Sequence, residues 1–218
     1  MSIKAVLYDF DGTLADTVPL ILESFKAAYI KVFGYCNRTE EDFKRYIGLP
    51  LISTFEMHDE ITADKLFYAY LEYNEKLLRD NKVKLFDGVY EELTRIKDSG
   101  IVQGIVTSKR SESLQISLDL LDLNKYFDIC VTKESTSKHK PDKEPLIYAA
   151  RKLNIEDISE ILYVGDAKGD ILCARNAGAK SCLVSWTDMD KEEILKAEPD
   201  HIIKEMCELS CIIQSGEL

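Results

Sequence analysis

Asp9-Phe10-Asp11-Gly12-Thr13 directly follows residues 3–8, a mostly apolar run that predicts a buried strand. Residues i and i+2 of a strand point to the same side, so the carboxylates of Asp9 and Asp11 are expected to converge on one small volume. Two like charges at such short range need a cation or a shared proton. Mg²⁺ facing a phosphate meets that need, because this ion prefers hard oxygen ligands. The stretch therefore predicts phosphoryl-transfer chemistry.

The same stretch has two alternative interpretations. Asp-Gly is common in turns, so a capped turn without chemistry is the simpler alternative. A calcium-binding loop of the EF-hand type needs Gly at its sixth position and Glu at its twelfth. Counted from Asp9, these positions hold Leu14 and Leu20, which excludes that kind of loop.

The composition is ordinary for a soluble globular protein. The chain has 218 residues and a formal net charge of −11, which disfavours nucleic acids and anionic membrane surfaces as partners. No apolar run is long enough for a transmembrane helix. Asp9 and Asp11 interrupt the N-terminal apolar run too early for a signal peptide. We therefore expect no nucleic-acid partner and no membrane partner.

The cysteines point to a reducing compartment. None of the six forms a Cys-x-x-Cys pair, and Cys207 and Cys211, although four residues apart, lack the nearby histidines of a zinc site. A chain of this length does not need disulfides for stability. We therefore expect reduced thiols and a cytoplasmic protein. A monomer is favoured, although the sequence leaves the oligomeric state open.

Strand and helix patterns alternate after Asp87. The expected helices are residues 89–99, 111–121, 144–153 and 169–176, and the expected strands are residues 101–107, 129–132, 161–164 and 181–184. Such alternation predicts a Rossmann-like α/β fold, with a parallel sheet covered by helices on both faces. From Val18 to about Leu78, the apolar residues recur at three- and four-residue intervals, which predicts helices, and no strand pattern appears. We therefore predict a discontinuous α/β core, residues 1–15 and 87–218, with an inserted all-helical domain, residues 16–86.

Polar clusters follow several of the predicted strands. Thr107-Ser108 ends the second strand, and Gly165-Asp166, with Asp170 one helical turn later, ends a strand further along. Lys140-Pro141 precedes the helix expected from residue 144. Ligands of open parallel sheets bind beyond the carboxyl ends of the strands. The order of these clusters therefore predicts one site at that edge.

Together with the opening stretch, these clusters resemble the four signature motifs of the haloacid dehalogenase superfamily of phosphatases. The helical insertion is similar to the mobile cap that this superfamily places after its first strand. The segments Ile47-Gly-Leu-Pro-Leu51, Lys140-Pro-Asp-Lys-Glu-Pro145 and Arg175-Asn-Ala-Gly178 look like the phosphoglycolate phosphatase branch. The related β-phosphoglucomutases carry a cap His and a Lys-Gly-x-x-Arg loop, and this chain lacks the basic residues of both.

The resemblance implies a role for each carboxylate. Asp9 would be the nucleophile that becomes phosphorylated, and Asp11 would protonate the leaving oxygen and then deprotonate water. The implied Mg²⁺ ligands come from Asp9, Asp11 (through its backbone carbonyl), Asp166 and Asp170. Mg²⁺ uses few carboxylates and keeps several waters, which suits so sparse a set.

The phosphoryl group would be held by a second set of residues: Gly12, Thr107, Ser108, Lys109 and Lys140. Thr107 would donate from its hydroxyl, and the backbone N–H groups of Ser108 and Lys109 would add to the cradle. Lys140 would supply fixed positive charge. Lys138 and Lys143 compete for that role, and the following Pro141 favours Lys140.

The inserted domain would close over the site and contact the rest of the substrate. Gly48 would allow close backbone approach, and Arg45 could pair with an anionic substituent. An exposed helix residue without function is the alternative for Arg45. Residues 14–17 and 84–88 would be the two hinge segments.

We therefore expect an Mg²⁺-dependent phosphatase that hydrolyses a small phosphorylated metabolite, similar to phosphoglycolate phosphatase. A phosphotransferase like β-phosphoglucomutase and an inorganic pyrophosphatase are alternatives on the same fold. A regulatory protein that kept the site but lost turnover is a third possibility, which the intact motifs disfavour. The sequence leaves the substrate open among phosphoglycolate, pyrophosphate, sugar phosphates and nucleotides.

Overall fold

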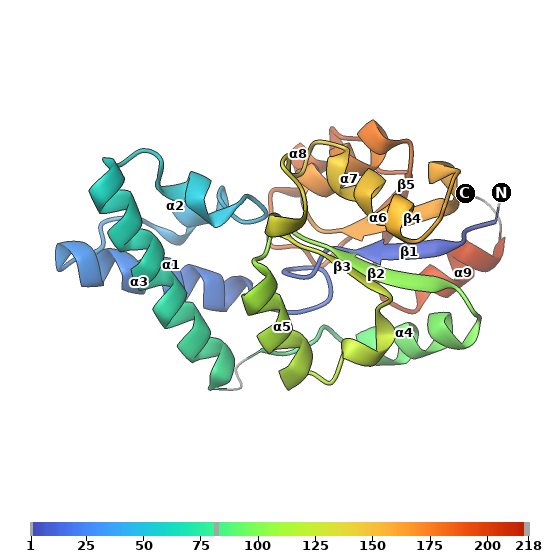
Figure 1. The fold of residues 1–218 in the computed structure, drawn as a ribbon, viewed down its shortest axis with the longest axis horizontal. Helices are drawn as coiled ribbons and strands as arrows, with labels where there is room; N and C mark the ends of the chain where they lie inside the picture. The colour runs from blue at the N-terminus through green and yellow to red at the C-terminus, as the bar shows by residue number, and fades with distance from the viewer. Residues whose placement is uncertain (1, 81–82, 216–218) are drawn as a thin grey trace.

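The computed structural model describes residues 2–80 and 83–215 and has two parts, a sheet domain and a group of helices beside it (Figure 1). The six strands are β1 (Ala5–Tyr8), β2 (Val102–Val106), β3 (Ile129–Val131), β4 (Ile161–Gly165), β5 (Lys180–Val184) and β6 (His201–Ile203). They form one parallel sheet in the order β3-β2-β1-β4-β5-β6. The strand β1 is central, so residues that follow it lie at the middle of the sheet edge.

Helices cover both faces of the sheet, as the alternating pattern predicted. One face carries α4 (Val89–Asp98), α5 (Ser111–Leu120) and α9 (Glu208–Ser215), and the other carries α6 (Glu144–Lys152) and α7 (Lys168–Ala177) (Figure 1). Along β1, Val6 and Tyr8 are buried in the first layer, whereas Ala5 and Leu7 are buried in the second. This alternation follows from the two-residue period of a strand and confirms a doubly covered α/β sheet.

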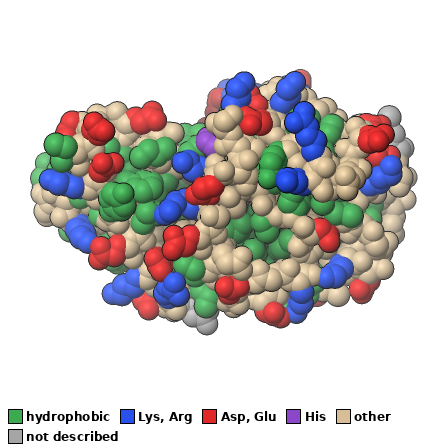
Figure 2. All heavy atoms as spheres, in the orientation of Figure 1, with side chains coloured by type: hydrophobic (Ala, Val, Ile, Leu, Met, Phe, Trp, Pro, Cys, Tyr) green, Lys and Arg blue, Asp and Glu red, His purple; other side chains and the backbone are tan. Residues whose placement is uncertain are grey.

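The inserted stretch is helical and has an apolar core of its own. It contains α1 (Val18–Phe33), α2 (Glu40–Lys44), a 3₁₀ turn (Leu51–Phe55) and α3 (Glu60–Arg79), which together we call the cap. The ring of Phe25 in α1 stacks on the ring of Phe43 in α2, with the centroids 5.2 Å apart. The ring of Tyr70 in α3 also packs against Phe25, with the centroids 4.7 Å apart. Figure 2 shows that the surface is notched where the cap meets the sheet domain.

The two chain segments that join the cap to the sheet domain are bonded to each other. Asp16 N donates to Lys84 O at 2.8 Å, and Phe86 N donates to Leu14 O at 3.0 Å. Ala15 and Leu85 form an isolated antiparallel bridge between these hydrogen bonds. The boundaries predicted for the two domains fall here and remain a prediction; their ranges also include residues 1, 81–82 and 216–218, which lie outside the described residues.

The observed elements differ from the predicted ones mainly near the C-terminus. The sequence pattern did not reveal β6, α8 (Lys191–Leu195) or α9. The other predicted strands and helices occur within one or two residues of their expected limits. None of the helices within residues 2–80 and 83–215 combines the length and apolar character that crossing a membrane requires.

Candidate active site

The carboxyl ends of three neighbouring strands bring together residues far apart in the sequence. Tyr8 at the end of β1 is in register with Ile105 of β2 and Val164 of β4. The next residue, Asp9, donates its backbone N–H to Val164 O at 2.9 Å. Thr107 and Asp166 follow β2 and β4 at the same edge, and both are buried. The parallel register therefore places these three side chains around one point.

Lys140 completes this group from the loop before α6. Its Nζ atom lies 2.7 Å from Asp9 Oδ2 and 2.6 Å from Asp170 Oδ1, and all three side chains are at least 96% buried. Burial alone would lower the pKa of Lys140, but the charges of Asp170 and Asp9 outweigh it and raise that pKa above its usual value. Lys140 is therefore a fixed cation between two carboxylates. The competing candidates Lys138 and Lys143 are both exposed, and Lys138 pairs with Asp142.

Asp9, Asp166 and Asp170 form a compact cluster of carboxylates. One oxygen from each lies within 4.8 Å of the other two. Burial raises the pKa of Asp9 to about 6 despite the Lys140 ammonium, and burial with the charges of Asp170 and Asp9 raises the pKa of Asp166 well above its usual range. Such crowding of buried carboxylates is stabilised by a bound cation. The three side chains fit a divalent metal with oxygen ligands.

Gly12 has no side chain, and this makes room for the carboxylate of Asp166. Its φ angle is +79°, a conformation that favours glycine, and a Cβ atom here would lie 2.4 Å from Asp166 Oδ2. Thr13 Oγ1 also donates to Asp166 Oδ1 at 3.3 Å. The Gly-Thr pair that ends the opening motif therefore shapes the position of Asp166, which lies 153 residues later.

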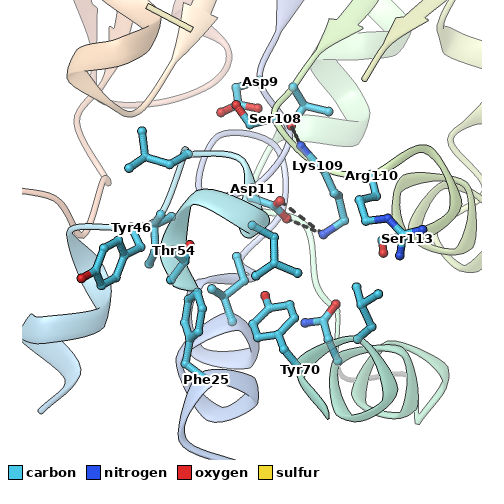
Figure 3. Close-up of a pocket in the computed structure, with 18 residues that line it drawn as sticks. Asp9, Asp11, Phe25, Tyr46, Thr54, Tyr70, Ser108, Lys109, Arg110 and Ser113 are labelled. Atoms are coloured by element: carbon cyan, nitrogen blue, oxygen red, sulfur yellow. Dashed lines mark hydrogen bonds and ion pairs between the residues drawn. The ribbon is translucent and has the colours of Figure 1, made fainter. Parts of the chain in front are cut away.

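Asp11 points away from the carboxylate cluster. Its Oδ1 atom accepts a hydrogen bond from Thr17 Oγ1 at 2.6 Å. Lys109 Nζ lies 2.9 Å from Asp11 Oδ1 and 3.2 Å from Asp11 Oδ2 (Figure 3). The side chain of Asp11 is thus separate from the predicted metal ligands. This arrangement suits the proton-transfer role that the resemblance implies. Asp11 lines the same cavity as Asp9 but does not belong to the carboxylate cluster.

A cavity of about 80 Å³ lies between the sheet edge and the cap (Figure 3). Asp9, Asp11, Thr107, Ser108, Lys109 and Arg110 line it from the core side. The cap side is mostly apolar, with Ile21, Phe25, Leu49, Leu51, Tyr70 and Leu71. The predicted cap loop takes part through Gly48, whose added Cβ would lie 3.8 Å from Ala167 Cβ of the core. The cap loop therefore lies close to the core beside the cavity.

Two hydroxyl groups at the cavity have no partner among the described residues. Thr54 Oγ1 on the cap side and Ser108 Oγ on the core side are both buried and unbonded. Leaving a buried hydroxyl unpaired costs free energy, so such groups require a ligand or water as partner. They are acceptors and donors available to a substrate.

Arg45 does not reach this cavity. Its guanidinium pairs with Asp42 at 3.0 Å, its side chain is 63% exposed, and it is absent from the cavity lining. The i, i+3 spacing on the short helix α2 makes this local pair favourable. The residues beside it that do line the cavity are Tyr46, Ile47 and Gly48.

The sequence did not reveal several residues that hold the cluster in place. Thr187 Oγ1 lies 3.3 Å from Asp166 Oδ2, and it also accepts a hydrogen bond from Met189 N. Tyr163 OH lies 3.1 Å from Asp170 Oδ1 and donates to Val106 O at 2.7 Å. No short motif marks these side chains. Tyr163 is buried within β4, and Thr187 lies in the loop after β5, so only the folded chain shows their contacts.

Comparison with known proteins gives relatives along the whole chain. The chain is 40% identical over 214 residues to a protein of Caldanaerobacter subterraneus subsp. tengcongensis named "Putative pyrophosphatase PpaX", with 98% of this chain and 96% of that protein covered. It is 32% identical to the pyrophosphatase PpaX of Oceanobacillus iheyensis, with 98% of each chain covered. A crystal structure of a predicted phosphoglycolate phosphatase from Haemophilus somnus shares the fold with a TM-score of 0.87, at 22% identity and with 97% and 98% of the two chains covered.

The family assignment also rests on a family model. Residues 6–184 match the model described as haloacid dehalogenase-like hydrolase. That range contains Asp9, Thr107 and Asp166 from the strand ends, and Lys140 from the loop before α6. The chain therefore belongs to the haloacid dehalogenase-like hydrolase family.

Proposed function

We propose that this protein is a Mg²⁺-dependent phosphatase that forms a covalent phosphoryl intermediate on Asp9. One observation carries the proposal: Asp9 is buried against the Lys140 ammonium at 2.7 Å, beside the carboxylates of Asp166 and Asp170. The cavity that faces Asp9 also contains the acid–base candidate Asp11. A nucleophile, fixed positive charge and a proton carrier are the groups that phosphoryl transfer requires.

In the first step, a carboxylate oxygen of Asp9 attacks the phosphorus atom. The new O–P bond forms as the bond from phosphorus to the leaving oxygen breaks, and Asp11 gives a proton to that oxygen. Lys140 offsets the negative charge on the equatorial phosphate oxygens, and the Thr107 hydroxyl, 6% exposed at the end of β2, donates to one of them. Because the Lys140 ammonium is already held in place before the reaction, it stabilises the developing negative charge with little reorganisation.

In the second step, Asp11 takes a proton from water as that water attacks the phosphorus atom. The bond between phosphorus and Asp9 breaks, which restores the carboxylate and releases inorganic phosphate. Asp9, Asp166 and Asp170 and the backbone carbonyl of Asp11 would hold Mg²⁺, which would supply charge neutralisation for the phosphoryl oxygens. The cap excludes bulk water from the cavity during this sequence.

The substrate that we propose is a small phosphate compound. A phosphomonoester such as phosphoglycolate follows from the resemblance of three segments to the phosphoglycolate phosphatase branch. Inorganic pyrophosphate is a second candidate, because relatives named as pyrophosphatases cover nearly the whole chain at 40% and 32% identity. We also propose that residues 16–86 act as the cap domain and that the enzyme is cytoplasmic.

The test is release of inorganic phosphate from pyrophosphate, phosphoglycolate and a set of sugar phosphates. Activity is expected with Mg²⁺, and EDTA should abolish it. Asp9→Asn should lower kcat at least about 1,000-fold, since the nucleophile is lost while the shape of the site is kept. Rapid acid quenching with labelled substrate should recover a phosphorylated Asp9 peptide from the wild type.

Asp98→Asn is a suitable control because it changes an exposed carboxylate at the end of α4. Its activity should equal that of the wild type. Phosphate release that survives Asp9→Asn would contradict the assignment of the nucleophile. Sugar phosphate that is isomerised without release of phosphate would instead show a mutase.

A further inference from the structure

The side chain of Lys109 occupies an unusual position for a lysine. It starts in the loop after β2, is 7% exposed, and places Nζ within 3.2 Å of both carboxylate oxygens of Asp11. A buried ammonium is costly unless it is paired, so this contact is the main source of its stability. Within the described part of the chain, Asp11 is the carboxylate with which Lys109 forms an ion pair.

The position of Lys109 relative to the reaction follows from the role of Asp11. To protonate the leaving oxygen, the Asp11 carboxyl group must lie about 2.6–3.2 Å from it. The Nζ atom of Lys109 is 2.9 Å from Asp11 Oδ1, so the ammonium and the leaving oxygen are on the order of 6 Å apart or closer. A negative group attached to the leaving oxygen directly, or through one or two atoms, comes within reach of that ammonium.

The charges around the cavity are all on the core side. Among the described residues that line it, the cations are Lys109 and Arg110, and the cap contributes apolar and uncharged polar side chains. Arg110 is already engaged by Glu134 at 3.6 Å and Glu112 at 3.7 Å. Lys109 is the more deeply buried of the two cations, with 7% of its side chain exposed against 31% for Arg110, and it is the one that lies beside Asp11.

The wall of the cavity that carries Lys109 offers a second group to such an anion. The buried Ser108 hydroxyl, which has no partner among the described residues, lies on the same wall as Lys109 and can donate to the same anion.

We propose that Lys109 is a specificity-determining residue that selects substrates whose leaving group carries a negative charge next to the leaving oxygen. Before substrate binds, Lys109 holds Asp11; when substrate binds, its ammonium contacts the anion, and Asp11 becomes free to contact the leaving oxygen. Pyrophosphate and phosphoglycolate both have such a leaving group, whereas neutral alcohol esters do not. This inference rests on the proposed phosphatase function.

The experiment compares two substrates that differ in one group. Phosphoglycolate carries a carboxylate where 2-hydroxyethyl phosphate carries a neutral hydroxymethyl group. The wild type should prefer phosphoglycolate in kcat/KM by about 10- to 100-fold, because one charge-assisted hydrogen bond separates them, and pyrophosphate should share this advantage. Lys109→Met, which keeps length but removes the charge, should reduce that preference at least tenfold, while Lys109→Arg should keep most of it.

The controls separate the possible outcomes. Lys26→Met changes an exposed lysine on α1 and should leave the preference as in the wild type. If Lys109→Met folds poorly, inhibition of the wild type and Lys109→Arg by methylenediphosphonate and by orthophosphate still tests the site, with diphosphonate expected to bind more tightly. An equal loss on both esters in Lys109→Met, or no preference in the wild type, would overturn the proposal. Absence of phosphate release from every substrate would refute the phosphatase function instead.

Discussion

Lys140 Nζ lies 2.7 Å from Asp9 Oδ2 and 2.6 Å from Asp170 Oδ1, so one buried ammonium joins the proposed nucleophile to a carboxylate of the metal cluster. These residues come from the loop after β1, the loop before α6 and the first turn of α7. A buried ion pair contributes less to stability than its short distances suggest, because desolvation is costly. Its loss, however, leaves uncompensated charge in the core.

Lys140→Met should therefore lower both activity and stability. We expect kcat to fall at least about 100-fold, because the phosphoryl group loses a fixed cation. In EDTA, the free energy of unfolding should fall by about 3–5 kcal/mol, because Asp9 and Asp170 lose their shared partner. Urea unfolding followed by circular dichroism measures this change.

Lys138→Met is the control for this prediction. It removes an exposed partner of Asp142 and should change stability by less than about 0.5 kcal/mol. An equal effect of both variants would contradict the assignment of Lys140 as the fixed cation.

Gly12→Ala should damage the metal cluster in particular. The added Cβ would meet Asp166 Oδ2 at 2.4 Å, so the carboxylate must move. Gly34→Ala is a matched control because Gly34 has φ +81°, close to the +79° of Gly12, and nothing lies within 4 Å of its added Cβ. Both variants should lose about 1–2 kcal/mol of stability through backbone strain. Titration of phosphate release with Mg²⁺ should show at least tenfold weaker apparent affinity in Gly12→Ala alone.

Thr187→Val should weaken Mg²⁺ binding with little effect on the fold. The hydroxyl of Thr187 lies 3.3 Å from Asp166 Oδ2, and valine has a similar shape without a donor. Groups that orient metal ligands typically contribute about 10- to 100-fold to metal affinity. Calorimetric titration with Mg²⁺ measures the change. Thr94→Val, which removes a hydroxyl bonded to Tyr90 O on α4, should bind Mg²⁺ like the wild type.

The metal-free protein should become less stable as pH rises from about 4 to about 6. Burial raises the pKa of Asp9 from its ordinary value of 3.8 to about 6, so in this window the folded state holds a proton that the unfolded chain has released. The slope of stability against pH is then negative. Urea unfolding in EDTA at several pH values tests this, and Asp9→Asn should make the slope less steep, because the raised pKa of Asp166 still contributes to it. Mg²⁺ binding near pH 6 should release protons, because a metal ligand must be ionised; a stability that rises through this window would contradict the expectation.

The strand-end residues were predictable because the parallel sheet fixes where they lie. Asp9, Thr107 and Asp166 each follow a predicted apolar strand, and the fold class alone implies that such positions share one edge. Lys140 was identified among three nearby lysines through its neighbour Pro141. The folded chain buries it beside Asp9 and leaves Lys138 exposed.

Other features depend on contacts that no local pattern encodes. The pairing of Lys109 with Asp11 joins residues 98 positions apart and is set by the path of a loop. Arg45 was predicted near the substrate from its place in the sequence, but the local pair with Asp42 directs it to the surface. The strand β6 has three residues, too few to show alternation, and it lies at an edge of the sheet.

The paired segments that join the cap to the sheet domain restrict how the cap can move. Because Asp16 and Phe86 bond across to Lys84 and Leu14, neither segment can shift independently of the other. The two segments therefore form one joint at Ala15 and Leu85. Asp11 forms a bridge with Ala15, so the proposed proton carrier is attached directly to this joint, where any opening of the cap would displace it least.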